Sequence, residues 1–469
     1  MSRDVDVAII GAGSAGLYAL GQVRHHTDNY VLIDGGPLGT TCARVGCMPS
    51  KLMIQVADDY HHRHRFEQEG ISGMSAMHVR SASSLEHVRL MRDAFVGRVL
   101  ANSTGKMSES HFIAANARFV DAHTLETDDG QRIRARRIII ATGSRPVVPG
   151  AWAAFSDHVF TTDEIFELPR LPETVAVIGL GVIGLELGQA MSRLGVQVTG
   201  IDQQRVIGGI VDPVVNAAAI DIIGDEFPLW LGQPAQLATA GDGRVRVTAG
   251  ERSVEVDAVL ASLGRRPNLD GLNLEAAGLT LEEDGVPRFD PQTLQVGDTD
   301  IFIAGDCTNT RPVLHEAGFE GRLAGFNAGR DVPLAFRRQT PLGITFCDPN
   351  IVSVGAQLDE LDPERIVIGE QELKPSGRAM VMGRNRGVIR VYADKADGRL
   401  LGAAMTAIKG ENLAHLVAWS IELGLTVPQL LAMPFYHPTL EEALQGALYN
   451  AKSQLEIDWP DWPVELKPA

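Results

Sequence analysis

Two cysteines, Cys42 and Cys47, stand close together in the segment TTCARVGCMPSK, which covers residues 40–51. Four residues separate them, so they could be half of a metal site, a structural disulfide or a redox-active thiol pair. A zinc site would usually add a second ligand pair, but the other two cysteines, Cys307 and Cys347, are isolated. Metal binding is therefore the minority interpretation, and no metal site is predicted.

The geometry of a disulfide limits how this segment can fold. On a regular helix, the Cα atoms of residues five apart lie ~8–9 Å apart, whereas a disulfide needs ~4.4–6.8 Å. We therefore expect Cys42 in an irregular turn, outside the helix that contains Cys47. Gly46 and Pro49 fit this arrangement, since a proline marks the start or a kink of a helix. Cys47 would then lie near a helix N-terminus, where the helix dipole and Lys51 favour a thiolate. An activated thiol in a short loop suits redox turnover better than stability.

Redox chemistry needs an electron donor or acceptor, and two segments carry the pattern of a dinucleotide site. Residues 5–34 and 175–202 each contain an apolar strand, G-x-G-x-x-G, a helical stretch, a second apolar strand and an acidic residue. The glycines permit a tight turn, close approach of a pyrophosphate and close helix–strand packing, and the acid binds ribose hydroxyls. One copy would be a weak signal, but two matched copies predict two nucleotide sites. The residues are Gly11, Gly13, Gly16 and Asp34 in the first copy, and Gly179, Gly181, Gly184 and Asp202 in the second.

The acid of the second copy indicates which nicotinamide cofactor binds. Asp202 suits a free ribose 2′-hydroxyl and would repel a 2′-phosphate. Arg205 follows the acid and is read as a solvated charge. NAD is therefore predicted at the second site.

Three further strand ends complete the domain pattern. RRIIIATGSRP (136–146) and AVLASLGRRPN (258–268) each end an apolar strand in a small-residue turn followed by Arg-Pro, and DIFIAGDCTN (300–309) ends in Gly-Asp. We predict an α/β fold with two Rossmann-like dinucleotide-binding domains and a C-terminal α+β dimerisation domain. The first domain comprises 1–150 and 271–335, the second 151–270, and the third 336–469, with a helix over 411–425 and a Pro- and Trp-containing tail at 458–469.

Composition limits the class of protein. The chain has 469 residues, of which 45% are hydrophobic, and its formal net charge is −17. The negative charge argues against a nucleic-acid partner, and no apolar run approaches the ~20 residues of a membrane helix. We expect a cytoplasmic protein, in which a disulfide is usually redox-active rather than structural.

These motifs together resemble the flavoprotein disulfide reductases, the class I pyridine nucleotide-disulfide oxidoreductases. The resemblance rests on C-x₄-C followed by Met-Pro-Ser-Lys, the two nucleotide motifs, the Gly-Asp at 305–306 and HPTLEEAL at 437–444. It covers essentially the whole chain and implies FAD at the first site, NAD at the second and a homodimer.

Within the family, the motifs are most similar to those of the dihydrolipoamide dehydrogenases. That likeness implies oxidation of protein-bound dihydrolipoamide, with a lipoylated carrier protein as partner and hydride transfer to NAD⁺ through FAD. A related NADH-dependent reductase of another disulfide, a metal or a quinone is the alternative, and a redox sensor with little turnover is a third possibility.

The resemblance also implies roles for individual residues. Cys42 corresponds to the interchange thiol and Cys47 to the thiol beside the flavin, with Lys51 and Glu186 as an ion pair near the flavin. His437 corresponds to the catalytic base that reaches the disulfide of the other subunit, oriented by Glu442. Thr41, Lys51, Ala141, Thr142, Gly143 and Asp306 are implied to complete the FAD site, and Gly264 and Arg265 are predicted to contact a cofactor.

At some positions this chain differs from the residues usual in the family. Thr40 stands where glycine is common, Arg44 where asparagine is common, and Asp34 where glutamate is common. Phe435 and Tyr436 precede His437, where a further histidine is often found. Arg44 and Tyr436 are candidates for lining the substrate channel, so these changes bear on substrate identity rather than on electron transfer.

Two other groups of reactive side chains receive a structural interpretation. The histidines of YHHRHR (60–65) are predicted to lie on a charged, solvated face. Cys307 and Cys347 are predicted to be small, buried or half-buried residues without a disulfide partner.

Overall fold

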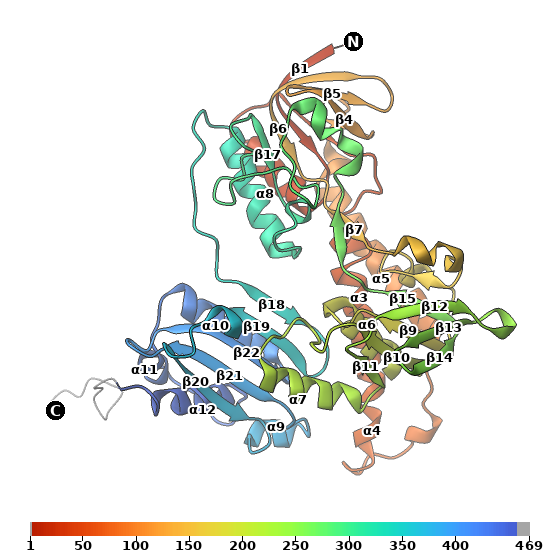
Figure 1. Cartoon of the computed structure of the whole chain (residues 1–469), viewed down its shortest axis with the longest axis vertical. Helices are drawn as coiled ribbons and strands as arrows, with labels where there is room; N and C mark the ends of the chain where they lie inside the picture. Colours follow the sequence, from red (N-terminus) through yellow and green to blue (C-terminus); the bar gives the residue numbers. More distant parts are fainter. Residues whose placement is uncertain (1, 457–469) are drawn as a thin grey trace.

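The computed structural model describes residues 2–456, and the predicted tail at 458–469 lies outside these residues. Figure 1 shows the first nucleotide-binding region at the top, with the second region and the C-terminal region below it. The first region is built on a seven-stranded sheet in the order β3-β2-β1-β6-β5-β4, and β17 also pairs with β6. Its strands are β1 (Ser2–Ile10), β2 (Tyr30–Ile33), β3 (Phe112–Ile113), β4 (Ala117–Asp121), β5 (Thr124–Thr127), β6 (Arg132–Ile140) and β17 (Ile301–Ile303).

The second region contains a parallel five-stranded sheet in the order β11-β10-β9-β15-β8 and a three-stranded antiparallel sheet, β12-β13-β14. A short antiparallel ribbon of β7 and β16 connects it to the first region. The strands are β7 (Ser144–Pro146), β8 (Val159–Phe160), β9 (Thr174–Ile178), β10 (Gln197–Asp202), β11 (Leu229–Leu231), β12 (Ala235–Thr239), β13 (Val245–Ala249), β14 (Arg252–Val256), β15 (Ala258–Ala261) and β16 (Arg265–Pro267).

The C-terminal region is an antiparallel five-stranded sheet in the order β18-β19-β22-β21-β20, with helices packed against it. The predicted helix over 411–425 is α10, which spans Gly410–Glu422. The strands are β18 (Leu342–Thr345), β19 (Asn350–Gly355), β20 (Ile366–Glu372), β21 (Val388–Asp394) and β22 (Leu400–Ala407), and the other helices are α9 (Gly377–Val381), α11 (Val427–Leu431) and α12 (Glu441–Lys452).

The remaining α-helices belong to the first two regions. α3 leaves the first region and runs beside α6 of the second (Figure 1). These helices are α1 (Ser14–Val23), α2 (Thr41–Arg44), α3 (Cys47–His61), α4 (Arg63–Phe66), α5 (Ser81–Asn102), α6 (Val182–Arg193), α7 (Pro213–Gly224) and α8 (Leu314–Ala328). Short 3₁₀ helices occupy Met74–Ala76, Thr104–Lys106, Gly150–Phe155, Ile165–Glu167, Gly241–Gly243, Asp270–Leu272, Leu274–Ala277, Asp306–Thr308 and Leu358–Glu360.

The parallel strands form the core of both nucleotide-binding regions. All four residues of β2, YVLI, are buried, as expected for a parallel strand that is covered on both faces. In the first region α1 and α8 pack so closely that a Cβ on Gly321 would lie 2.2 Å from the carbonyl oxygen of Ala15. Among the described residues, no helix has the length and apolar character needed to cross a membrane.

Candidate active site

A cavity of about 640 Å³ lies between the first glycine-rich turn, the cysteine segment and the start of α6. That volume falls within the ~300–1,000 Å³ typical of small-molecule sites. The predicted residues that line it are Gly11, Gly13, Asp34, Thr41, Cys42, Cys47, Lys51, Ala141, Thr142, Gly143, Glu186, Arg265 and Asp306. The structure therefore brings most of the residues predicted for the first site to a single cavity.

The two glycine-rich turns are built alike. Gly11 and Gly179 have φ angles of 105° and 95°. Residues that carry a side chain rarely adopt this backbone conformation. A Cβ on Gly16 would lie 1.9 Å from the carbonyl oxygen of Gly11, and a Cβ on Gly184 would lie 1.9 Å from that of Gly179. Gly11 and Gly179 are therefore required by the backbone conformation of each turn, and Gly16 and Gly184 by the packing of each turn against its own helix.

The two acids hold these turns in the same way. Asp34 accepts hydrogen bonds from the N–H groups of Ala12, at 2.5 Å, and Gly36, at 2.6 Å. Asp202 accepts from the N–H groups of Leu180, at 2.7 Å, and Gln204, at 2.8 Å. Each carboxylate thus lies at its glycine-rich turn, where a ribose hydroxyl is predicted to bind.

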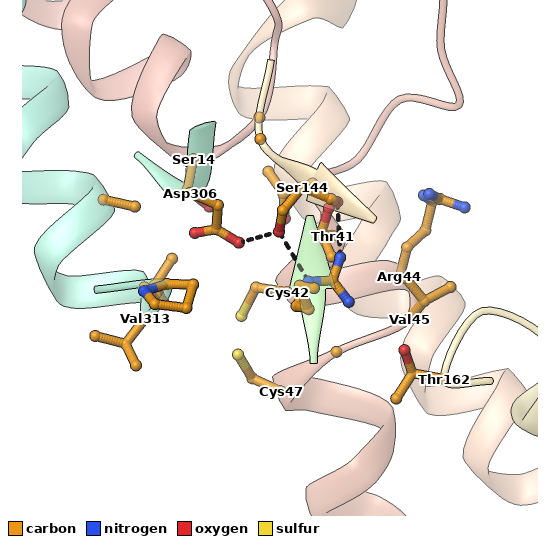
Figure 2. A pocket seen from close by; sticks show the side chains of 18 of the residues that line it. Ser14, Thr41, Cys42, Arg44, Val45, Cys47, Ser144, Thr162, Asp306 and Val313 are labelled. Atoms are coloured by element: carbon orange, nitrogen blue, oxygen red, sulfur yellow. Dashed lines mark hydrogen bonds between the residues drawn. The ribbon is translucent and has the colours of Figure 1, made fainter. Parts of the chain in front are cut away.

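Asp306 lines the same cavity as the first turn and is linked to the second region. Ser144 Oγ donates to Asp306 Oδ2 at 2.7 Å, and Arg265 Nε donates to Ser144 Oγ at 2.8 Å (Figure 2). Ser144, which follows the predicted Gly143, was not predicted from the sequence. Gly264 is not among the cavity-lining residues, and its carbonyl accepts from the N–H of Val147. The structure therefore places Gly264 at the β7–β16 ribbon.

The two cysteines lie on separate helices. Cys42 is in the one-turn helix α2, and Cys47 is the first residue of α3. The expectations that Cys47 begins a helix and that Cys42 lies outside this helix are confirmed. The segment at Cys42 differs from the expected irregular turn only in being a single helical turn. The helical turn forms because Thr40, at a φ of 65°, caps it by accepting the N–H of Ala43 at 3.2 Å. In Figure 2 the two sulfur atoms point toward each other, and both cysteines are free thiols.

The two thiols differ in acidity. A hydrogen bond from Cys42 lowers the pKa of Cys47 to about 7, and the positive charge of Lys51 acts in the same direction. The same hydrogen bond, together with burial, raises the pKa of Cys42. The reduced pair therefore holds its negative charge on Cys47 and its proton on Cys42.

This asymmetry predicts the alkylation behaviour of the reduced protein. The rate at which iodoacetamide modifies Cys47 should rise with pH around a midpoint of about 7, while Cys42 reacts only at higher pH. Only the thiolate is nucleophilic, so the midpoint reports the thiol pKa. Trypsin cleaves after Arg44, so mass spectrometry separates the peptides of Cys42 and Cys47. A Cys47 midpoint near the ~8.5 of a free cysteine would contradict the asymmetry.

Lys51 and Glu186 form the ion pair predicted for them. Lys51 Nζ donates to Glu186 Oε2 at 2.7 Å, although the residues lie 135 positions apart. The other carboxylate oxygen of Glu186 accepts the N–H of Phe346 at 2.9 Å, and Lys51 lies over the Phe346 ring at 4.6 Å. Phe346, which was not predicted from the sequence, connects the C-terminal region to this ion pair.

His437 and Glu442 also form their predicted pair, but away from the cavity of the same chain. His437 Nδ1 lies 2.9 Å from Glu442 Oε1, and the N–H of Thr439 binds Oε2 at 2.9 Å. The bond to His437 lowers the pKa of Glu442. The His437 side chain is 80% exposed, and neither residue is among those that line the cavity. Because Glu442 binds Nδ1 of His437, the Nε2 atom of the ring is available for a proton.

Arg44 and Tyr436, which differ from the residues usual in the family, lie in different parts of the structure. Arg44 lines the cavity, but in Figure 2 its guanidinium points away from the two sulfur atoms. Tyr436, which is 82% exposed, lies beside His437. Of the two, Tyr436 has the more accessible position for contact with a substrate.

The remaining cysteines and the histidine run do not form a metal site in the described part of the chain. Cys307 and Cys347 are buried, as predicted, and burial raises the pKa of each thiol. His61 departs from the predicted solvated face, because it is half-buried and burial lowers its pKa to about 4.

Comparison with known proteins gives the family. Residues 5–321 match the pyridine nucleotide-disulphide oxidoreductase family, and residues 342–448 match the dimerisation domain of the same family. The chain belongs to this family.

Individual relatives are similar over nearly the whole chain. A dihydrolipoyl dehydrogenase of Haloferax volcanii is 29% identical, covering 97% of this chain and 98% of that protein. A mercuric reductase of Acidithiobacillus ferrooxidans is 28% identical, covering 95% of this chain and 82% of that protein. The solved structure of the Cu(II) complex of the HOCl-induced flavoprotein disulfide reductase RclA from Escherichia coli superimposes with a TM-score of 0.83 at 21% identity, covering 95% of this chain and 99% of that chain. The predicted α/β fold is confirmed.

Pyridine nucleotide-disulphide oxidoreductases use FAD and a pyridine nucleotide, and the residues of this chain fit both. Gly13 and Gly181 have φ angles of −73° and −70°, which any residue can adopt, and a Cβ on either would meet no atom within 4 Å. Packing within the protein does not require glycine there, whereas the close approach of a pyrophosphate does. The buried Oγ1 of Thr142, at the first cavity, has no hydrogen-bond partner among the described residues. We expect it to bind the cofactor.

The dimerisation domain has an exposed apolar face, as expected of a domain that forms a dimer. Trp419, Leu423 and Met433 are largely exposed and line a groove that also includes Phe435 and Tyr436. An apolar patch of this kind is typical of a protein–protein interface. The family match and this groove support a homodimer, and His437 lies next to the groove in sequence.

Proposed function

We propose that the protein is an NAD-dependent dihydrolipoyl dehydrogenase that acts in the cytoplasm on protein-bound dihydrolipoamide. The observation that carries the proposal is the asymmetric thiol pair, with Cys42 protonated and Cys47 acidic, in the cavity that the first glycine-rich turn also lines. Relatives named dihydrolipoyl dehydrogenase match this chain over nearly their full length, whereas the mercuric reductases extend beyond it. The likeness to the dihydrolipoyl dehydrogenases supports the dithiol substrate.

The thiol acidities assign a direction to the exchange. A substrate thiolate attacks the sulfur of Cys42 in the oxidised pair, and the Cys42–Cys47 bond breaks. Cys47 leaves as a thiolate, which is favoured because its pKa is about 7 and a more acidic thiol is a better leaving group. The second substrate thiol attacks the mixed disulfide and releases Cys42, which takes up a proton. The substrate is then oxidised by two electrons, and the cysteine pair is reduced by two.

Two groups outside the pair serve this exchange. His437 accepts protons from the substrate thiols at Nε2, since Glu442 holds Nδ1 at 2.9 Å and stabilises the protonated ring. His437 is exposed and away from the cavity of its own chain, so we propose that it serves the cysteine pair of the partner subunit. Lys51 stabilises the Cys47 thiolate, and Glu186 holds Lys51 in place.

The cofactors are assigned to the two glycine-rich turns. Gly11, Gly13, Gly16, Asp34, Thr142 and Asp306 would hold FAD, and Gly179, Gly181, Gly184 and Asp202 would hold NAD. When bound, FAD supplies the hydride chemistry that connects the thiol pair with the nicotinamide. The chain contributes the stabilised thiolate, the Lys51–Glu186 pair and the position of each turn.

The nucleotide preference gives a separate prediction. Replacing Asp202 with alanine should raise the KM for NADH by ~10-fold and change that for NADPH much less. Asp202 favours a free 2′-hydroxyl over a 2′-phosphate, and a lost hydrogen bond to a charged group costs ~1.5–3 kcal/mol. Steady-state kinetics with both nucleotides measures this. Because Asp202 also binds the N–H of Leu180, Asp202→Asn is a matched variant that keeps the shape of the side chain. Equal effects on the two nucleotides in both variants would exclude NAD selection by Asp202.

The substrate is tested by turnover with NAD⁺. Free dihydrolipoamide and a panel of lipoylated carrier domains should each reduce NAD⁺, with the physiological carrier giving the highest kcat/KM. Formation of NADH is followed by its absorbance. No NADH formation with any dithiol, in a protein that contains FAD, would contradict the proposed substrate.

A second candidate is an NADH-dependent reductase of another disulfide, a metal or a quinone. It is favoured by the similarity to mercuric reductases and by exposed Tyr436, which precedes His437 where a further histidine is often found in the family. Activity with such acceptors and none with dihydrolipoamide would select this candidate.

A further inference from the structure

The helix that begins with Cys47 is attached to α6 at two points. The first is Lys51–Glu186, and the second is Arg193–Asp58, with Nη1 of Arg193 at 2.5 Å from Oδ1 of Asp58. Asp58 lies seven residues after Lys51, and Arg193 lies seven residues after Glu186. Seven residues are two helical turns, or ~10 Å. The side-by-side helices α3 and α6 therefore run in the same direction, with one ion pair every two turns (Figure 1).

Arg193 is the centre of a buried network in which all three regions meet. Its side chain is 3% exposed and binds Glu226 of the second region at 2.6 Å, in addition to Asp58. It also binds Oδ2 of Asp348, in the C-terminal region, at 3.2 Å. A planar guanidinium with five donors can hold several carboxylates at once, which an ammonium group cannot do with the same geometry.

The C-terminal region contacts both ion pairs through one short segment, residues 346–348. The N–H of Phe346 binds Glu186 at 2.9 Å, next to Lys51. Asp348 binds Arg193, and Gln189, between the two pairs on α6, both donates to the carbonyl and accepts the N–H of Asp348. The contact at Arg193 and the contact at Lys51 are therefore parts of one clamp on α3.

We propose that Arg193 is a positioning residue for the redox cysteines: by binding Asp58 it fixes α3 against α6 and so keeps Lys51 and Cys47 in place. This inference deepens the proposed function, because it concerns the same cysteine pair. Its test uses neither dihydrolipoamide nor NAD, so it can fail while the proposed function stands, and the reverse also holds.

The proposal and a simple charge effect predict opposite signs. Asp58 lies eleven residues after Cys47, ~16 Å along the helix, and removing a distant negative charge by itself lowers the pKa of a thiol. If Asp58 acts by holding α3 in place, its loss lets α3 shift, so that Lys51 moves away from Cys47. Because the positive charge of Lys51 then stabilises the thiolate less, the pKa of Cys47 rises. An opposite charge within ~4–6 Å changes a pKa by one unit or more, so we expect a rise of about one unit.

The test compares neighbouring aspartates in the reduced holoenzyme. Asp58→Asn keeps the shape of the side chain and leaves Arg193 paired with Glu226 and Asp348. Arg193→Met would instead leave both Asp58 and Glu226 without their ion-pair partner. Asp59→Asn is the matched control, because exposed Asp59 carries the same charge one residue further on and binds only Gln55 among the described residues. The pKa of Cys47 is measured from the pH dependence of its alkylation, with peptide mass spectrometry as the readout.

The expected results separate the explanations. Asp58→Asn should raise the pKa of Cys47 by about one unit, Asp59→Asn should leave it within ~0.2 units, and Asp58→Glu, which keeps the charge, should restore most of the parent value. Thermal unfolding of each variant checks that the fold is retained. An unchanged or lowered pKa in Asp58→Asn, or an equal rise in Asp59→Asn, would overturn the proposal.

Discussion

Replacing Cys42 with serine is expected to lower NAD⁺ reduction by dihydrolipoamide by at least ~10³-fold, the scale on which loss of a catalytic nucleophile acts. Cys42 carries the proton of the reduced pair, and attack on its sulfur expels the acidic Cys47 thiolate. A serine oxygen forms neither the disulfide with Cys47 nor the mixed disulfide with the substrate. Steady-state formation of NADH measures the loss.

Two controls show whether the loss is specific to the thiol exchange. Cys307→Ser should keep near-parental activity, since Cys307 is buried, donates to the carbonyls of Ile140 and Ala304, and a serine can donate to the same groups. Reduction of ferricyanide by NADH, which bypasses the cysteines, should survive in Cys42→Ser. A Cys42→Ser enzyme with a tenth or more of the parent activity would exclude the proposed role of Cys42.

Replacing His437 with glutamine is expected to lower the same rate by ~10²–10⁴-fold, the usual contribution of a general acid or base. Glutamine keeps hydrogen-bonding capacity but cannot take the substrate proton. Glu442→Gln should cost less, because the histidine remains and only its orientation and the stabilisation of its charged form weaken. Measuring kcat for both variants tests this order, and His87→Gln, at an exposed position on α5, is the control.

Sharing of the site between subunits can be tested with the same variants. When Cys42→Ser and His437→Gln chains are mixed and allowed to exchange subunits, a mixed dimer contains one doubly altered site and one intact site if the residues act across the interface. Activity should therefore return well above that of either variant alone. If His437 served the cysteines of its own chain, each site in the mixed dimer would carry one lesion and no activity would return.

The sequence predicted local geometry better than long-range contacts. The two glycine-rich turns were predictable because strand, glycine spacing, helix and acid all lie within about thirty residues, and Asp34 and Asp202 hold their turns in matching ways. The start of α3 at Cys47 followed from Gly46 and Pro49. The Lys51–Glu186 pair spans 135 residues, so no local pattern indicates it, and only the resemblance to a family did.

Other features depend on tertiary structure and were not predictable. The helical turn at Cys42 forms because Thr40 adopts a backbone conformation that favours glycine and caps the turn with its hydroxyl. The Arg193 network joins residues from three regions, and each of its carboxylates looks like an ordinary surface charge in the sequence. His61 is half-buried beside that network, so its departure from the predicted solvated face has the same origin.

In the proposed function, Cys42 and Cys47 exchange electrons with the nicotinamide site through the bound flavin. The most direct measurement is the thiol state of the two residues before and after anaerobic addition of NADH to the oxidised holoenzyme, with iodoacetamide trapping and peptide mass spectrometry. We expect a Cys42–Cys47 disulfide before addition and alkylated Cys42 and Cys47 afterwards, with Cys307 and Cys347 unchanged. A pair that stays in the same state while NADH is consumed and the flavin is reduced would contradict this account.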